Sequence, residues 1–195
     1  MLRYPQPAKC GILRKIGILS KMRNIANRNI LKMIYHSLFS SHLQYGAQLW
    51  GQTNTENQNQ IQQLQNKAVR KISFKKRFDP VEPLYKELNI LKFRDMVHLQ
   101  NCLFMSQIEQ NQKLAETFPA LKHCGDNHKY NTRSAAKKLI DIPLLNTDTY
   151  GTQSAKYNCI TDWNNFRKTF SNLRLEECTY GTVKFLLKRY YLEKN

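Results

Sequence analysis

The sequence predicts a mainly α-helical protein: a three-helix bundle followed by a helical C-terminal extension with an irregular loop region. Two observations lead to this prediction. Apolar residues recur at three- and four-residue spacing along several long stretches, which is the period of an amphipathic helix. The 195 residues include only 7 Gly and 6 Pro, which disfavours a turn-rich β sandwich or barrel.

The first expected helix covers residues 10–23, where Ile12, Ile16 and Leu19 share one face. Asn27 and Asn29 are residue types favoured at helix N-termini. They should open a second helix of about 15 residues. Its inward face is predicted to hold Ile30, Leu31, Ile34, Leu38 and Phe39.

Residues 42–51 (HLQYGAQLWG) are aromatic and punctuated by glycine, so they are expected to form a packed connector. Thr55 and Gln58 then fit a capping box, in which the Thr side chain caps the first turn and the Gln reaches back to it. A third helix should follow to about Phe74. Its predicted apolar stripe is Ile61, Leu64, Ala68 and Ile72.

Residues 79–83 (DPVEP) interrupt the helical pattern and predict a boundary between a basic domain, 1–78, and a C-terminal region, 79–195. A short helix should follow, and then a long one over about 92–112. The face of the long helix is predicted to hold Phe93, Met96, Val97, Leu103, Phe104 and Ile108. Residues 122–158 are polar and turn-like, and two further helices are expected near 162–173 and 179–192.

The charge is large and unevenly distributed. The chain has 31 Lys and Arg against 14 Asp and Glu. Residues 1–78 carry 14 of the basic side chains and one acid, Glu56. Such a stretch repels itself and predicts a polyanionic partner, above all RNA, DNA or an RNA–DNA hybrid. No apolar run approaches the roughly 20 residues that span a bilayer, so no membrane partner is expected.

Basic residues cluster at the end of the third helix, with no acid expected nearby, and recur along the first. Lys32 belongs with the larger of these two groups. A solvated helix face is the alternative reading of these residues. The predicted phosphate-binding side chains are Arg14, Lys15, Lys21, Arg23, Lys67, Arg70, Lys71, Lys75, Lys76 and Arg77. Tyr35, Tyr45, Trp50 and Trp163 are candidates for base stacking, although Tyr45 and Trp50 better fit core packing.

The residues offer little for catalysis or metal binding. No Asp precedes Asp79, no two Asp are adjacent, and the neighbouring acids Glu176 and Glu177 fit a solvated helix face. His98, Cys102, His123, Cys124 and His128 lack the Cys-x2-Cys spacing of a zinc finger, so we expect no bound metal and a structural role for Cys102. Five scattered cysteines and the absence of a signal-peptide pattern predict an intracellular protein, in the cytoplasm, the nucleus or both.

Several segments, taken in order, resemble one family. They are 17–23 (GILSKMR), 35–38 (YHSL), 43–46 (LQYG), 49–51 (LWG), 64–72 (LQNKAVRKI), 82–92 (EPLYKELNILK), 128–133 (HKYNTR) and 163–164 (WN). Together they resemble the thumb and post-thumb region of LINE-type, Jockey-like non-LTR retrotransposon reverse transcriptases. The HKYNTR segment is similar to that family's H-x-Y-x-T-R signature.

The resemblance implies a thumb-like bundle that tracks the primer–template duplex of an RNA-directed DNA polymerase. It implies no catalytic residues, because the palm's paired aspartates have no counterpart here. Mg²⁺ is expected only for the missing palm, and a palm-containing polypeptide is a possible partner. The opening residues 1–7 depart from the family and suggest a truncated copy with a new start. A decayed element without activity, and a host-recruited binding or scaffold protein that uses the helix near 92–112, are the alternatives.

Overall fold

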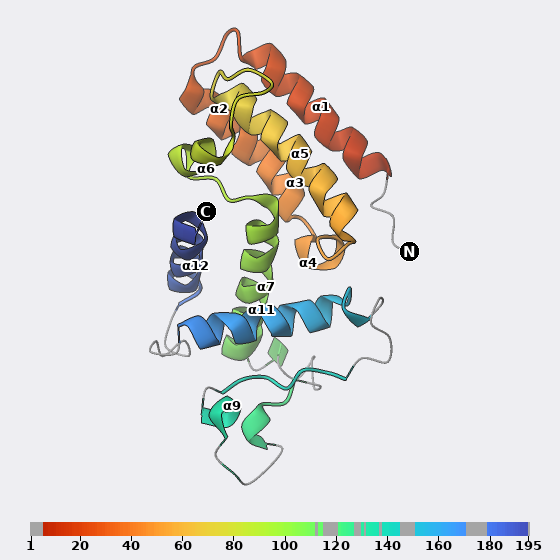
Figure 1. The fold of residues 1–195 in the computed structure, drawn as a ribbon, viewed down its shortest axis with the longest axis vertical. Coiled ribbons are helices and arrows are strands. Elements are labelled where there is room, and N and C mark those ends of the chain that lie inside the picture. The colour runs from red at the N-terminus through yellow and green to blue at the C-terminus, as the bar shows by residue number, and fades with distance from the viewer. Residues whose placement is uncertain are drawn as a thin grey trace. The chain divides into compact units, whose positions relative to one another are not determined.

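The computed structural model is mainly helical, as the sequence predicts (Figure 1). It describes residues 6–111, 113–114, 121–126, 130, 132–136, 138–144, 151–170 and 179–194. The chain divides into two compact units, an N-terminal unit of residues 1–97 with 188–195 and a C-terminal unit of residues 98–187. No helix in the described ranges is long and apolar enough to cross a membrane.

The first helix of the N-terminal unit, α1 (Gln6–Met22), packs along α5 (Thr55–Ile72), and the two run side by side in Figure 1. Ile12 and Leu19 are buried on the inward face of α1, and Ile16 is half-buried. The three residues predicted to share a face therefore do so. Their spacing of three and four residues places them over one another on successive turns.

The second helix changes type along its length. Asn27 caps it, since its Oδ1 accepts the Ile30 N–H at 3.0 Å. α2 (Arg28–Ile34) continues as a π-helical segment, η1 (Tyr35–Ser40), and then as α3 (Ser41–Gln44). The π-type turn is wider than an α turn, so the buried positions fall at a strict spacing of four. The buried residues are Leu31, Tyr35, Phe39 and Leu43.

This change corrects the predicted inward face of the second helix. Ile30 is 44% exposed and Leu38 is 37% exposed, although both were expected inside. Leu31 and Phe39 are buried as predicted. The wider turn rotates Leu38 outward, which an α-helical period cannot anticipate. Tyr35 lies four residues after Leu31 at the end of α2, so ordinary helical spacing already places it on the buried face.

The connector after α3 turns at Gly46, whose φ of 64° lies in the left-handed region that glycine adopts without strain. α4 (Ala47–Trp50) follows. Tyr45, expected in the core, is 84% exposed, so that prediction is wrong. Gly51 is tightly enclosed, since a Cβ at this position would lie 2.7 Å from Val97 Cγ2.

α5 begins one residue earlier than the predicted capping box requires, so the prediction that Thr55 caps this helix is wrong. Asn54 is the N-cap, and its side chain accepts the Asn57 N–H at 3.1 Å. Gln58 donates instead to the carbonyl oxygens of Thr53 and Gly51, at 2.9 and 3.1 Å. The predicted apolar stripe of α5 is buried throughout, which confirms it.

A buried polar contact fixes α5 against its neighbours. Gln65, 1% exposed, donates from Nε2 to the Tyr35 hydroxyl at 2.9 Å and to the Leu91 carbonyl at 2.8 Å. One amide thus joins α5 to η1 and to the segment that precedes α7 (Phe93–Gln110). Such a contact specifies how these elements pack, because a buried amide left without partners is costly.

α6 (Glu82–Leu88) packs on α5, so the residues after the break at 79–83 belong to the N-terminal unit. The division between the units falls inside α7, at residues 97 and 98. Of the predicted face of α7, Phe104 is half-buried and the other five members are buried. Residues 101–103, 105 and 106 are all buried, which indicates a helix enclosed on several sides here.

The described part of the C-terminal unit also contains η2 (Cys124–Asp126), α9 (Arg133–Ala136), α11 (Ala155–Thr169) and much of α12 (Tyr180–Lys194). Asn164 on α11 binds the backbone of Ile140 through two hydrogen bonds. The Ile140 N–H donates to Asn164 Oδ1 at 2.9 Å, and Asn164 Nδ2 donates to the Ile140 carbonyl oxygen at 2.8 Å. The two helices predicted near 162–173 and 179–192 are present with shifted bounds.

Some predicted features lie outside the described residues. They are residues 1–5, His128, Lys129 and Asn131 of the HKYNTR segment, the Glu176–Glu177 pair and Cys178. The side chains of Cys10 and Trp50 are likewise not described.

Candidate nucleic-acid interface

A basic groove runs between α1 and α5 in the N-terminal unit, with a volume of about 600 Å³. Seven cationic side chains line it, all of them predicted from the sequence. Its full lining is Ile16, Arg23, Gln63, Asn66, Lys67, Arg70, Lys71, Lys75, Lys76, Arg77 and Phe78. No carboxylate belongs to this lining, so the only charge that the lining side chains carry is positive.

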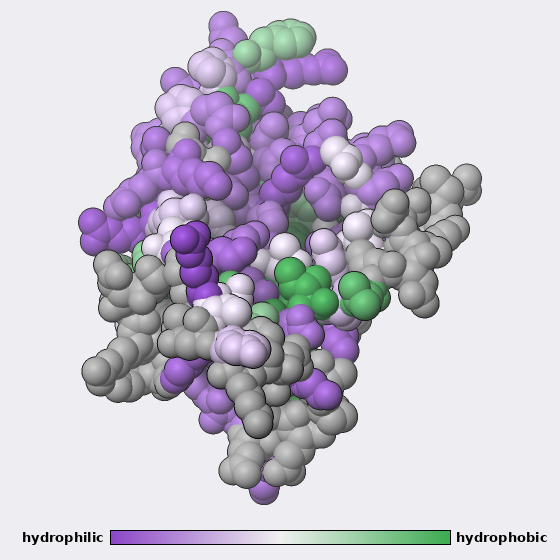
Figure 2. All heavy atoms as spheres, turned by 60° about the horizontal axis from the view of Figure 1, so that its bottom comes forward, coloured by the Kyte–Doolittle hydropathy of each residue, from purple (hydrophilic) through white to green (hydrophobic). Residues whose placement is uncertain are grey.

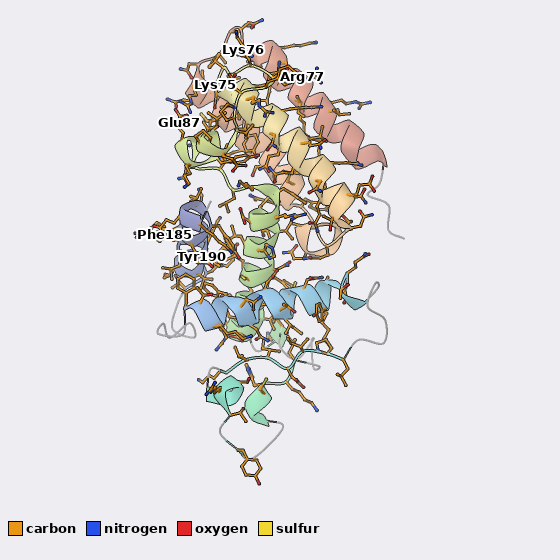
Figure 3. The ribbon with its side chains drawn as sticks, viewed as in Figure 1. Lys75, Lys76, Arg77, Glu87, Phe185 and Tyr190 are labelled. Carbon is orange, nitrogen blue, oxygen red and sulfur yellow. The ribbon has the colours of Figure 1, made fainter. Side chains whose placement is uncertain are left out.

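Helical spacing explains how the sequence builds this groove. Gln63, Lys67, Arg70 and Lys71 lie three and four residues apart on α5, so they share one face. That face is turned away from the buried stripe of Ile61, Leu64, Ala68 and Ile72. Lys75, Lys76 and Arg77 extend the same charge onto the turn after α5 (Figure 3). Ile16 of α1 and Arg23, in the turn that follows α1, also line the groove.

The turn after α5 is held by two hydrogen bonds to one residue. Arg70 Nε donates to the Asp79 carbonyl oxygen at 2.9 Å, and the Lys76 backbone N–H donates to Asp79 Oδ2 at 2.8 Å. The expectation that no acid lies near this cluster is therefore wrong. Asp79 sits at its edge because the turn needs an acceptor for the Lys76 N–H.

Glu87 on α6 is a second acid whose pKa is affected by a cation of the groove. Arg28 forms an ion pair with it at 2.5 Å, and the hydrogen bond from Arg28 is the main cause that lowers the pKa of Glu87. Lys75 lowers the pKa of Glu87 further through its charge. None of the seven groove cations forms an ion pair with a carboxylate among the described residues. Their charge is thus available to an external anion.

The remaining predicted cations lie outside the groove. Arg14 and Lys21 are exposed on α1, Lys15 is half-buried there, and Lys32 is half-buried on α2. Partial burial lowers the pKa of Lys15. The structure therefore brings together seven of the ten predicted phosphate-binding residues.

Sequence reasoning missed three polar or aromatic members of the groove: Gln63, Asn66 and Phe78. Asn66 accepts hydrogen bonds from the Tyr85 hydroxyl at 2.6 Å and from Gln62 Nε2 at 2.9 Å. Gln63 could have been found, since it lies one helical turn before Lys67. Phe78 carries no periodic signal, because it lies in a turn.

Two of the predicted stacking aromatics are core residues. Tyr35 and Trp163 are each 1% exposed, so neither can meet a base from solvent. Tyr35 packs its ring on Phe39 with centroids 5.1 Å apart. Trp163 donates from Nε1 to Glu109 Oε1 at 2.8 Å. Both satisfy their polar atom inside the protein, as buried Tyr and Trp normally do.

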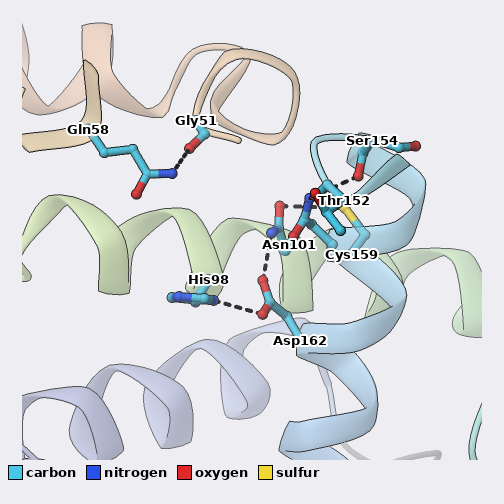
Figure 4. Close-up of polar contacts among 9 residues, drawn as sticks. Gly51, Gln58, His98, Asn101, Thr152, Ser154, Cys159 and Asp162 are labelled. Carbon is cyan, nitrogen blue, oxygen red and sulfur yellow. Dashed lines mark hydrogen bonds and ion pairs between the residues drawn. The ribbon is translucent and has the colours of Figure 1, made fainter. Parts of the chain in front are cut away.

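A Cys, a His and an Asp come together in the C-terminal unit without forming a nucleophilic site (Figure 4). Asp162 accepts from His98 Nδ1 at 2.8 Å and from Asn101 Nδ2 at 2.7 Å. Cys159 donates its thiol proton to Asn101 Oδ1 at 3.4 Å. Burial raises the pKa of the Cys159 thiol to about 12. The thiol is therefore protonated near neutral pH, and a reactive cysteine needs the thiolate.

The candidate zinc ligands are dispersed within the described ranges. His98 is paired with Asp162, and Cys102 is fully buried, which raises its pKa well above the usual value. No three His, Cys, Asp or Glu side chains in those ranges gather as metal ligands would. The buried position of Cys102 agrees with its predicted structural role.

The molecular surface fits a solvated, charged protein. On the face drawn in Figure 2, hydrophilic residues cover most of the described surface, and hydrophobic residues form small groups. The basic groove is the candidate interface, because seven of the predicted phosphate-binding cations line it. Comparison with protein-family models, curated proteins and solved structures gave no match.

Proposed function

We propose that the chain binds nucleic acid through phosphate contacts in the basic groove, as the thumb-like part of a LINE-type reverse transcriptase. One observation carries the proposal: seven cations, from α5 and from the turns that follow α1 and α5, line one groove whose lining contains no carboxylate. Holding these charges together is unfavourable unless an anion neutralises them. A phosphate backbone also adds the free energy of counterion release.

The dimensions of the groove suit a nucleic-acid backbone. Its wall on α5 runs from Gln63 to Lys71, about 12 Å at the helical rise of 1.5 Å per residue. That length equals roughly three to four base steps at 3.4 Å each. Several consecutive phosphates can therefore meet the groove at once. Such contacts position the nucleic acid without reading its sequence, so RNA, DNA and RNA–DNA hybrid all remain partners of this proposal.

The proposed family rests on the sequence segments that resemble it, and two of these segments contribute residues to the groove. Residues 64–72 (LQNKAVRKI) supply Asn66, Lys67, Arg70 and Lys71 to the lining. Residues 17–23 (GILSKMR) end in Arg23, which also lines the groove. The segments that carry the resemblance thus supply most of the proposed phosphate contacts, which supports a thumb-like role.

A scaffold role through α7 has less support. That alternative needs an accessible face on the helix. Cys102, Leu103 and Met105 are buried, and so are the polar Asn101 and Ser106. A helix enclosed in this way has little surface left for a protein partner.

The test is a salt titration of a variant that removes charge without disturbing the turn. Lys67, Lys71 and Lys75 are replaced together by Gln, whereas Arg70 is kept because it binds the Asp79 carbonyl. Affinity for a fluorescent duplex is measured at several salt concentrations. If all three contact phosphates, the slope of log affinity against log salt should fall by about 2 to 3.

A matched control removes equal charge elsewhere. Lys156, Lys168 and Lys184 are exposed in the C-terminal unit, and their replacement by Gln should leave the slope unchanged. An equal loss in both variants would mean that total charge, and not the groove, drives binding. A folded groove variant with unchanged affinity and slope would refute the proposal.

A further inference from the structure

Two phenylalanines lie among the cations at the end of the basic groove. Phe78, part of the groove lining, is 90% exposed. Phe74, four residues earlier in the same turn, is 45% exposed. An isolated exposed aromatic is common and needs no explanation. Two of them inside a run of Lys and Arg is a more specific arrangement, because a phosphate-binding surface gains nothing from apolar rings unless they meet bases.

Phe74 also adopts a backbone conformation that a bulky residue rarely occupies. Its φ is 56°, in the left-handed region. It follows the last residues of α5, where Phe74 N–H donates to the Lys71 carbonyl at 3.4 Å and Lys75 N–H to the Arg70 carbonyl at 3.0 Å. This is the hydrogen-bond pattern of a Schellman C-cap, in which glycine or asparagine normally takes the left-handed position.

α6 ends with the same motif and the usual residue. Asn89, with φ 56°, takes the left-handed position, and the Ile90 N–H donates to the Tyr85 carbonyl at 3.0 Å. Phe74 is therefore an unusual residue for this motif, because the equivalent position after α6 is occupied by the smaller Asn89. Strained residues of this kind cluster at binding and catalytic sites.

Each ring is accompanied by a guanidinium group of the groove. Arg23 lies over the Phe74 ring, 5.4 Å from its centroid, and Arg77 over the Phe78 ring at 5.6 Å. Cation–π contact at these distances holds a ring next to a charge. The pairing therefore places a flat apolar surface beside a group that binds phosphate, which matches the base and the backbone of one nucleotide.

We infer that Phe78, assisted by Phe74, stacks on an unpaired base, so that the basic groove takes single-stranded nucleic acid or a frayed duplex end. The inference rests on the proposed phosphate binding and adds the class of nucleic acid. A base inside a duplex has both faces covered by its neighbours, whereas an unpaired or terminal base offers a face to a ring. Stacking tolerates any base, because every base has a π face.

The test compares two single strands with equal charge. One is a mixed-sequence oligonucleotide of about ten nucleotides, within the usual site size of such surfaces. The other is its abasic counterpart, with the same phosphates and no bases. The full chain should bind the base-bearing strand at least about five-fold more tightly, the weakest effect expected from one stacked base.

Phe78→Ala should remove most of this preference and leave affinity for the abasic strand unchanged. Because Phe78 is almost fully exposed, the variant should fold, which its melting curve checks. Equal binding of the two strands by the wild-type chain would refute the inference, as would an unchanged preference in Phe78→Ala. Neither result would contradict the proposal that the groove binds phosphates. That proposal fails separately, if Gln at Lys67, Lys71 and Lys75 leaves both strands bound as before.

Discussion

Arg70 donates its Nε–H to the Asp79 carbonyl oxygen at 2.9 Å, which joins the last turn of α5 to a residue nine positions later. The same Asp79 accepts the Lys76 N–H through its side chain. Together the two bonds close the turn that carries Lys75, Lys76, Arg77 and Phe78. One of the groove cations, Arg70, therefore shapes the turn that carries three of the others.

Replacing Asp79 should change stability and nucleic-acid affinity in opposite directions. Asp79→Ala removes the acceptor of the Lys76 N–H, which should cost about 1 kcal/mol of unfolding free energy. It also removes an acid at the edge of the basic groove, so affinity for a duplex should rise. Denaturant unfolding and a binding titration measure the two effects.

Asp79→Asn separates the two effects, because its amide oxygen still accepts the hydrogen bond while the charge is gone. It should be more stable than Asp79→Ala and show a similar gain in affinity. Weaker binding by a folded Asp79→Asn would mean that the carboxylate organises the groove and does not merely oppose the ligand.

The sequence predicted helices well wherever an apolar stripe follows the ordinary α period. The stripe of α5, including Ile61 and Ala68, is buried as expected. The prediction failed for Leu38, because the π-type segment η1 rotates the later part of that helix. It also failed for Ile30, which lies on the exposed side of α2 before that segment begins. Nothing in the local composition announces a π turn, since packing of the finished bundle decides it.

The sequence predicted the cations of the groove but not its aromatic residue. A cluster of cations on one helix face can be read from helical spacing, so Lys67, Arg70 and Lys71 were identified. Tyr35 and Trp163, which the sequence makes candidates for stacking, are buried, whereas Phe78, which no sequence pattern marks, is exposed. Tyr and Trp suit both core and surface, because one end of each side chain is apolar and the other polar. Only the tertiary fold separates the two cases.

Alkaline pH should destabilise the N-terminal unit. Burial raises the pKa of Tyr35 and of Tyr85 above the ordinary value, and this outweighs the opposing hydrogen bonds from Gln65 and Gln62. In the unfolded chain each hydroxyl ionises near pH 10. Above that pH the unfolded state loses protons that the folded state retains, so stability is fully present below about pH 10 and falls as the pH rises.

The measurement is the free energy of unfolding between pH 8 and 11 for the wild type and for the Tyr35→Phe, Tyr85→Phe double variant. The variant should be less stable at pH 8, because it loses the hydroxyl hydrogen bonds of both residues. Above about pH 10, the free energy of unfolding of the variant should nevertheless fall less steeply than that of the wild type. Parallel curves for the two proteins would contradict the expectation.

An ion pair in the C-terminal unit should matter far more than an exposed one. Glu109 and Arg167 form an ion pair with side-chain exposures of 16% and 8%. Glu109 also accepts from Trp163 Nε1. Glu109→Ala would leave a buried guanidinium and an indole N–H without these acceptors, at a cost of about 3 kcal/mol. Denaturant unfolding followed by tryptophan fluorescence checks it.

Arg189 and Glu193 supply the matched control for this variant. Their ion pair is 2.7 Å long, but its side chains are 67% and 65% exposed. Glu193→Ala should leave stability almost unchanged, as expected for an exposed pair one helical turn apart. Equal losses in the two variants would show that the Glu109 contacts are worth no more than a surface pair.

The two helix C-caps should respond differently to substitution, because the same left-handed position holds Phe74 in one and Asn89 in the other. Asn89→Ala removes a short polar side chain that tolerates the left-handed conformation and puts alanine, which disfavours it, in its place. Because Asn89 is exposed, little else is lost. We expect a loss of about 1 kcal/mol in unfolding free energy.

Phe74→Asn should leave stability within about 1 kcal/mol of the wild type. Relief of the left-handed strain contributes about 1–2 kcal/mol. The lost apolar contact of a ring that is 45% exposed offsets roughly 1 kcal/mol of that gain. A loss above about 2 kcal/mol would show that Phe74 is held in place as a packing element. Near-neutral stability would mean that the fold does not require the strained phenylalanine, which leaves binding as the reason for a ring at this position.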